Sequence, residues 1–118
     1  MAKQLNLLVD QGTDFSTNVI AYANATTTTV LDMSNYTAGY GQIRKSHYSS
    51  THTANLTVNV WTSNTSGIIN LSMNNVITSG ITAGRYVYDV EIVSNDSPAK
   101  ITRVREGVLT ISPEVTKV

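Results

Sequence analysis

The sequence contains no cysteine, few charged residues and no long apolar run, and each absence excludes a class of protein. Without cysteine the chain can form no disulfide, no thiolate nucleophile and no cysteine-ligated zinc site. No apolar stretch approaches the roughly 20 residues of a membrane-spanning helix, and the N-terminus lacks the apolar segment of a signal peptide. We therefore expect a protein that is assembled in a cytoplasm and has no membrane partner.

The charges that are present balance one another. Charged residues make up 14% of the chain, and eight basic residues face eight acidic ones. The densest basic spots are the neighbours Arg44 and Lys45 and the alternate residues Arg103 and Arg105. These spots are too small to attract a polyanion, because a nucleic-acid-binding domain carries a basic patch or stripe. We therefore expect no nucleic-acid partner.

Threonine, serine and asparagine take the place of the missing charges, a composition that favours strands joined by polar turns. Hydrophobic residues form 41% of the 118 residues, enough for one core in a single domain over residues 1–118. Short alternating segments are separated by turn residues about every 8–12 positions, as in sandwich folds. We predict an all-β, immunoglobulin-like antiparallel β-sandwich of about 7–9 strands.

The clearest predicted strand runs from Gly84 to Ser94. Its apolar face consists of Tyr86, Tyr88, Val90 and Ile92, and its polar face includes Arg85, Asp89 and Glu91. The lead-in Ile81-x-x-Gly84-x-Tyr86 has the spacing of a tyrosine corner, in which the ring hydroxyl bonds back to the preceding connection. Gly84 and Tyr86 are therefore predicted to form a structural corner.

Further strands are predicted at residues 3–10, 13–22, 36–45, 54–61, 68–74 and 99–112, with one short helical turn at 76–79. Gly39 and Gly41 fall inside the 36–45 strand, where glycine marks a bulge or the close approach of another backbone. The alternation slips within the last strand, and a bulge at Glu106 and Gly107 would absorb the slip.

Residues that could carry chemistry form no recognisable motif. His47 and His52 lie in a polar loop without further metal ligands at a suitable spacing. Asp10, Asp14 and Asp32 could meet at one end of a sandwich and bind calcium, but the EF-hand spacing is absent. There is also no Gly-x-Ser-x-Gly nucleophile elbow. We predict no catalytic, cofactor-binding or metal-binding residues, and no enzymatic activity.

Three aromatic residues are candidates for contact with a partner: Trp61, Tyr40 and Tyr48. Exposed aromatic rings carry much of the binding energy in protein interfaces and can also form platforms for sugars. The alternative is that these rings pack at the edge of the core or under a loop. Between the two kinds of partner, a protein is favoured over a sugar.

Three stretches of the chain are distinctive when taken in order. They are residues 9–15 (VDQGTDF), residues 35–38 with 42–46 (NYTA and QIRKS), and residues 83–90 (AGRYVYDV) with the pattern Arg103…Glu106-Gly107…Ile111-Ser112-Pro113-Glu114-Val115-Thr116. Together they resemble a family of small virion proteins of tailed bacteriophages, especially the T4-like phages of marine cyanobacteria. The same frame is similar to the immunoglobulin-like N-terminal domain of some phage baseplate upper proteins.

The resemblance implies a non-enzymatic structural subunit, located in the virion, that docks on the head as a decoration protein or on the tail. Its partners would be other capsid or tail subunits, with self-association in the particle. Because edge strands expose unpaired backbone groups, the N-terminal strand and the long last strand are the predicted docking elements. Two alternatives stay open: a carbohydrate- or host-surface-binding module, and a neck or baseplate adapter.

Overall fold

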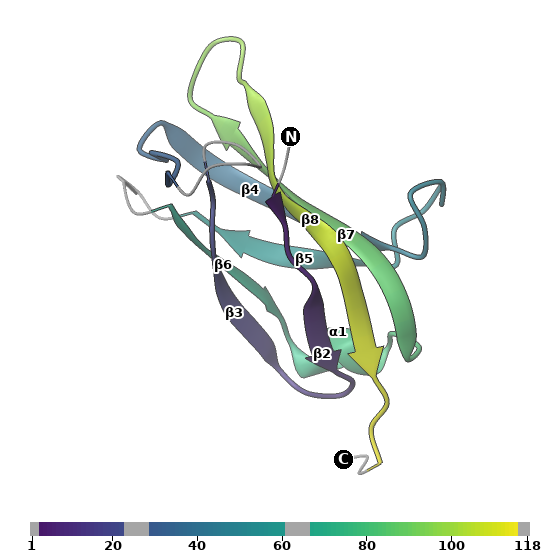
Figure 1. Ribbon diagram of the computed structural model, residues 1–118. Helices are drawn as coiled ribbons and strands as arrows, with labels where there is room; N and C mark the ends of the chain where they lie inside the picture. Colours follow the sequence, from purple (N-terminus) through teal and green to yellow (C-terminus); the bar gives the residue numbers. More distant parts are fainter. Residues whose placement is uncertain (1–2, 23–28, 61–66, 116–118) are drawn as a thin grey trace.

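The computed structural model describes residues 3–22, 29–60 and 67–115, and within these ranges the chain forms eight strands and one short helix (Figure 1). In chain order the elements are β1 (Lys3–Gln4), β2 (Leu7–Asp10), β3 (Phe15–Ile20), β4 (Tyr36–Arg44), β5 (Ala54–Asn59), β6 (Ile68–Met73), α1 (Asn75–Ser79), β7 (Gly84–Ser94) and β8 (Ile101–Ser112). The predicted all-β sandwich is confirmed.

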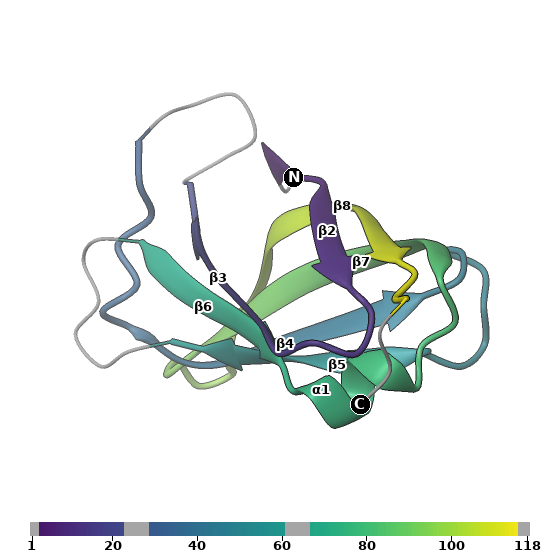
Figure 2. The same ribbon diagram turned by 90° about the horizontal axis from the view of Figure 1, so that it is seen from below.

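The strands form a curled sheet in the order β1-β8-β7-β4-β5-β6-β3, and β2 also pairs with β8. The curl occurs at β5, which belongs to both layers of the sandwich. Residues 54–56 of β5 pair with β4, whereas residues 57–59 pair with β6. One layer therefore contains β1, β2, β8, β7 and β4, and the other contains β6 and β3 (Figure 2).

The two N-terminal strands run parallel to β8, so the sheet is mixed and not, as was predicted, antiparallel throughout. The other neighbouring pairs are antiparallel. Lys3 lies opposite Arg105, and Val9 lies opposite Ile111. On its other side β8 pairs with β7 from Ile101 to Ile111. Most of the last strand is therefore flanked on both sides, which corrects the prediction that this strand is a docking edge. The reason is a long-range pairing that local alternation does not reveal.

Buried side chains from both layers meet in one core. Tyr86, Tyr88, Val90 and Ile92 of β7 all point inward, as the alternation of this strand predicted. Fully buried partners come from the other strands and from the loop before β4: Val9, Met33, Ile43, Ile69, Leu71 and Leu109. The core thus covers both layers and keeps the polar face of β7 on the outside.

Gly39 and Gly41 allow the layers to approach one another where β5 crosses over. A Cβ atom at Gly39 would lie 2.4 Å from Cγ1 of Val58, and one at Gly41 would lie 3.0 Å from Cβ of Leu56. The sequence predicted a bulge or another backbone at these glycines. The structure has neither there, and both glycines instead leave room for side chains of β5.

The bulge in the last strand lies earlier than predicted. Val90 pairs with Arg105 and Glu91 pairs with Arg103, so that Val104 is the extra residue. Val104 and Arg105 are both buried. The predicted position at Glu106 and Gly107 is wrong, and Gly107 has another role: a Cβ there would lie 2.3 Å from the carbonyl oxygen of Leu5. The bulge shifts every outward-facing residue after Arg103 by one position.

Candidate docking face

The predicted structural corner lies at the end of the sandwich beside α1. The hydroxyl of Tyr86 donates a hydrogen bond of 2.6 Å to the carbonyl of Thr82, four residues earlier. Gly84, between them, has a φ of +146°, a value that side-chain-bearing residues rarely adopt. This is the geometry of a tyrosine corner. The corner anchors the start of β7 and presents no group to a ligand.

The outward-facing side chains of three neighbouring strands form a continuous surface, which we call the outer face. It comprises Tyr40, Gln42 and Arg44 of β4, Val87, Asp89, Glu91 and Val93 of β7, and Ile101, Arg103 and Glu106 of β8. The backbone ladders fix these side chains in rows, because residues opposite one another in a sheet share a face. Tyr40, Glu91 and Arg103 form one such row.

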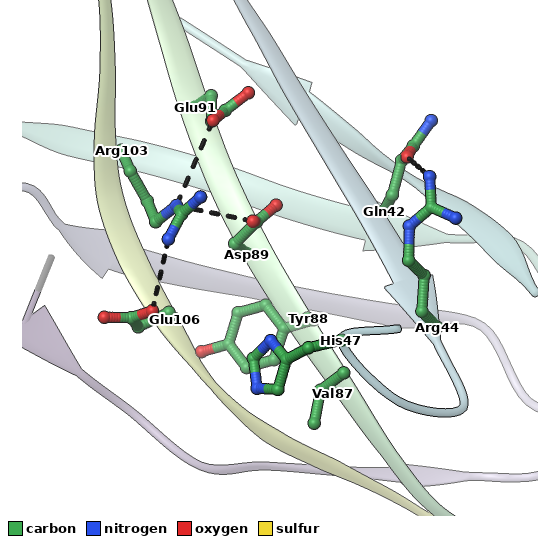
Figure 3. Close-up of a pocket in the computed structure, with 9 residues that line it drawn as sticks. All are labelled: Gln42, Arg44, His47, Val87, Tyr88, Asp89, Glu91, Arg103 and Glu106. Carbon is green, nitrogen blue, oxygen red and sulfur yellow. Dashed lines mark hydrogen bonds and ion pairs between the residues drawn. The ribbon is translucent and has the colours of Figure 1, made fainter. Parts of the chain in front are cut away.

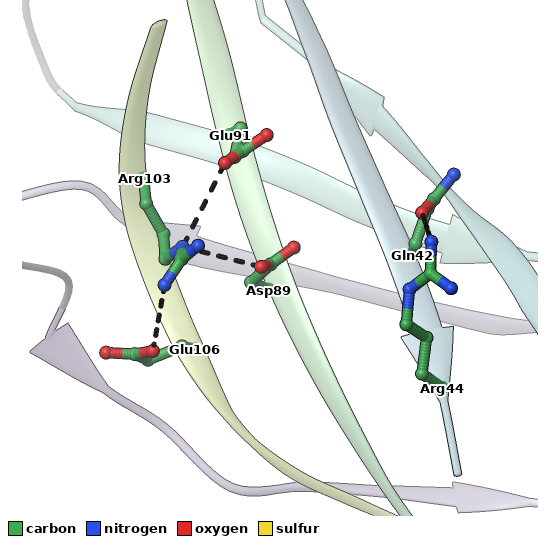
Figure 4. A network of polar contacts seen from close by, with 6 residues as sticks. All are labelled: Gln42, Arg44, Asp89, Glu91, Arg103 and Glu106. Atoms are coloured by element: carbon green, nitrogen blue, oxygen red, sulfur yellow. Dashed lines mark hydrogen bonds and ion pairs between the residues drawn. The ribbon is translucent and has the colours of Figure 1, made fainter. Parts of the chain in front are cut away.

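Arg103 is the centre of an ion-pair network on the outer face (Figure 4). Its Nε lies 3.4 Å from Oδ2 of Asp89 and 3.9 Å from Oε2 of Glu91, and its Nη1 lies 3.6 Å from Oε2 of Glu106. Arg103 and Glu106 share this face although they are three residues apart, because the Val104 bulge reverses the alternation between them. Three carboxylates around one guanidinium leave the network with a local negative charge.

A second pair of polar side chains lies on β4, beside the network. Arg44 donates from Nη2 to Oε1 of Gln42 at 2.9 Å and from Nη1 to the carbonyl of Ser49 at 3.0 Å. The second bond holds the loop after β4 against the sheet, with His47 at the margin of a hollow of about 290 Å³ (Figure 3). The hollow is lined mainly by charged and polar side chains, including Arg103 and Glu106.

The opposite end of the outer face is apolar. Tyr40 is 63% exposed and Ile101 is 66% exposed, and both line a second shallow hollow with Val93 and Glu91. Tyrosine and arginine are side-chain types that are enriched at protein interfaces, and the exposed isoleucine adds apolar surface beside them. The surrounding charges form a polar rim. The outer face therefore has the composition of a docking surface.

The three aromatic candidates from the sequence do not form one platform in the part of the chain that the structure describes. Tyr40 lies on the outer face, and Tyr48 is 96% exposed in the loop after β4. Trp61 lies outside the described residues. The sequence did not indicate that Ile101 or Glu106 lies on a contact surface. The only signal for them was the slip in alternation along the last strand.

Two of the three acidic residues considered for calcium, Asp14 and Asp32, accept hydrogen bonds from other residues of the chain. Asp14 accepts from the backbone N–H of Asn75 at 2.7 Å and from its side chain at 3.0 Å. Asp32 accepts from the backbone N–H of Ser34, and this bond lowers the pKa of the Asp32 carboxyl. Over residues 3–22, 29–60 and 67–115, no three histidine or acidic side chains converge on a possible metal position.

Residues of the described ranges also include no helix long and apolar enough to cross a bilayer. The one helix, α1, has five residues. It begins after Asn74, whose side-chain oxygen accepts a hydrogen bond from the N–H of Ile77, as in other N-caps.

Comparison with known proteins yields no family. No family model and no curated protein matches the chain. Among solved structures, one similar chain is described as a nucleoside hydrolase-related hypothetical protein from Saccharophagus degradans that is associated with carbohydrate metabolism. The two chains are 16% identical with a TM-score of 0.36, and the match covers 92% of this chain but 22% of that one. At this level of similarity the neighbour's description says nothing about the chain.

Proposed function

We propose that the protein is a non-enzymatic structural subunit of a tailed-phage virion, which docks on other capsid or tail proteins as one of many copies. The observation that carries the docking role is the outer face, where exposed Tyr40 and Ile101 lie beside the Arg103 network. The phage context rests on the resemblance of the three sequence stretches to virion proteins.

The outer face suits docking because its anchors are held in place before a partner arrives. Tyr40 and Ile101 are on strands that pair with β7, so their backbones are rigid. Arg103 is oriented by carboxylates on two strands. A tyrosine has few rotatable bonds, so little conformational entropy is lost when its ring is covered. The negative charge around Arg103 favours a partner surface that carries a lysine or arginine.

The proposal is tested by measuring the chain in purified particles. In the phage that encodes it, we expect the protein to appear in virion mass spectra at a fixed copy number. Replacing Tyr40 by alanine removes an interface anchor, and incorporation should fall at least about tenfold at limiting subunit concentration. Val76→Ala is the control, since Val76 is an exposed apolar residue on α1, outside the outer face.

Two results would contradict the proposal. One is the absence of the protein from purified particles, and the other is equal incorporation of the Tyr40→Ala variant and the control. Copy number separates the possible positions: a decoration protein would approach the number of capsid subunits, whereas a neck or baseplate adapter would form a ring of few copies.

A further inference from the structure

Strand β3 ends the strand order of the sheet, and among the described residues it pairs with β6 alone. The pairing runs from Phe15 opposite Met73 to Ile20 opposite Ile68. On its other side, the backbone N–H and C=O groups of β3 are available for hydrogen bonds to a further strand. Figure 2 shows β3 at the margin of its layer, apart from β2.

The composition of this edge is unusual for a strand exposed to water. Sheet edges normally carry charges, proline or bulges, which prevent pairing with other chains. The segment Phe15–Ile20 contains no charged residue and no proline, and its register against β6 is continuous. The opposite edge of the sheet is protected: β1 and β2 have only two and four residues, and they carry Lys3 and Asp10. The β3 edge lacks these protections.

Hydrogen bonds at both ends define the part of the edge that is open. At one end, Nε of Arg105 donates to the carbonyl of Ile20 at 2.9 Å, and Nη1 of the same guanidinium donates to the carbonyl of Gln4 in β1 at 3.4 Å. At the other end, the carbonyl of Thr13 accepts from the hydroxyl of Thr78 at 2.7 Å. The open stretch is therefore residues 14–19, and its centre lies close to Thr17.

We propose that this edge binds the same edge of a second copy of the chain, as an antiparallel β3–β3 pair centred on Thr17. A two-fold axis through Thr17 places Thr17 opposite Thr17 of the partner subunit. Ser16 then lies opposite Asn18 of the partner subunit, and Phe15 lies opposite Val19 of the partner subunit. The second layers of both copies become one continuous sheet.

The side chains of β3 are complementary in this register. Phe15, Thr17 and Val19 alternate with the exposed Ser16, Asn18 and Ile20. A two-fold axis perpendicular to the sheet pairs inward residues with inward ones, which gives two Phe–Val pairs and one Thr–Thr pair. Ser16 and Asn18 already accept hydrogen bonds of 3.0 Å from the Asn70 side chain, so this outer row is polar and uncharged.

Two other registers are less favourable. A shift by one residue would place inward side chains opposite outward ones. A shift by two, centred on Asn18, would require the carbonyl of Ile20, which already accepts a hydrogen bond from Arg105. The pairing uses the layer opposite the outer face, so each copy in the dimer keeps its outer face free. The inference therefore goes beyond the docking role and does not depend on the phage context.

The test compares two variants that change the same two exposed positions. In Ser16→Lys/Asn18→Lys, lysine lies opposite lysine at both outer pairs of the dimer. In Ser16→Lys/Asn18→Glu, lysine lies opposite glutamate at both pairs. Both variants lose the hydrogen bond between Ser16 and Asn70. Sedimentation of the full chain should show a reversible wild-type dimer, and the first variant should have a Kd at least about tenfold higher than the second.

A cross-link tests the register directly, because the chain contains no cysteine. Thr17→Cys puts the only thiol of each copy on the two-fold axis, at a Cα separation of about 4.5–5.5 Å, which a disulfide can span. We expect mild oxidation to give a covalent dimer with this variant, and monomer with Tyr48→Cys.

A wild-type chain that is folded by circular dichroism but monomeric at every concentration would overturn the proposal. Equal Kd values for the two charge variants would do the same. A Thr17→Cys variant that dimerises without cross-linking would overturn the register.

Discussion

The hydroxyl of Tyr88 donates a hydrogen bond to the carbonyl of Leu5, which lies 83 residues earlier in the chain. Tyr88 is buried on β7, and Leu5 lies between β1 and β2. Gly107 of β8 is opposite Tyr88 in the ladder, and its missing side chain leaves room for the carbonyl of Leu5. One hydrogen bond thus fastens the N-terminal segment to a strand that is not its neighbour.

Replacing Tyr88 by phenylalanine removes the donor and keeps the ring. The carbonyl of Leu5 then loses a buried partner, and we expect the free energy of unfolding to fall by about 1–3 kcal/mol. Urea denaturation measures the change. Tyr48→Phe is the control and should leave the midpoint unchanged, since that ring is exposed. Identical midpoints for the two variants would show that the hydrogen bond contributes no stability.

Tyr88 also makes stability depend on alkaline pH. Burial raises the pKa of its phenol from 10.0 to about 12, and the opposing effect of Arg105 is smaller. A folded-state pKa above the unfolded one means that this contribution is complete below pH 10 and is lost as pH rises toward 12. Between these values the Tm of the wild type should fall more steeply than that of Tyr88→Phe. If the Tm of both proteins fell equally steeply with pH over this range, the prediction would be contradicted.

The tyrosine corner is tested by Tyr86→Phe. The variant loses the bond to Thr82 but keeps the ring, which also lies 4.7 Å from the ammonium of Lys45. We expect a loss of about 1 kcal/mol in unfolding free energy. Hydrogen exchange should accelerate first in the connection between α1 and β7, because that connection is what the bond restrains. If this connection exchanged at the same rate in the wild type and in Tyr86→Phe, the Tyr86 hydroxyl would not anchor it.

Gly39→Ala tests the close approach of β4 and β5. The new methyl group would lie 2.4 Å from Cγ1 of Val58, so one of the strands must move. We expect destabilisation by about 1–3 kcal/mol, as for other overpacked sites. A double-mutant cycle with Val58→Ala should show positive coupling of about 1 kcal/mol, because the smaller side chain removes the clash. If the two substitutions changed the unfolding free energy additively, the destabilisation by Gly39→Ala would not come from a clash with Val58.

Asp96 makes stability depend on acidic pH. Its carboxylate accepts hydrogen bonds from Asn35 at 3.0 Å and Ser94 at 3.1 Å, and these bonds lower its pKa below the ordinary 3.8. A lowered folded-state pKa gives stability that is present above pH 3.8 and lost as pH falls through the folded value. The Tm of Asp96→Asn should therefore lie below that of the wild type near neutral pH, and the two should converge in acid. A Tm difference that stayed the same at every pH would show that ionisation of the Asp96 carboxylate is not its cause.

Strand β7 could be predicted in detail because burial of one face imposes strict alternation on the sequence. The spacing from Ile81 to Tyr86 likewise indicated the corner from local information. The Arg103 network could not be found in this way. The network forms only because Val104 is the bulged residue of β8, and the register of β8 against β7 determines which residue bulges. The sequence shows that the alternation slips but not where.

The layer change within β5 was also beyond sequence reasoning. Leu56 and Val58 alternate in the same way whether the strand pairs with β4, with β6 or with each in turn. The parallel pairing of β2 with β8 is a contact between the two ends of the chain, and nothing local to either strand reports it. Tyr40 could be proposed as a surface anchor by residue type alone, whereas Ile101 needed the position of its strand.

Because β5 serves both layers, the backbone ladder runs without a break from β1 to β3. In a sandwich whose layers meet only through side chains, a shearing force can slide one layer over the other. Here such a force must rupture backbone hydrogen bonds in β5 as well. A chain that is pulled at opposite layers can in this way transmit tension while its own shape is preserved.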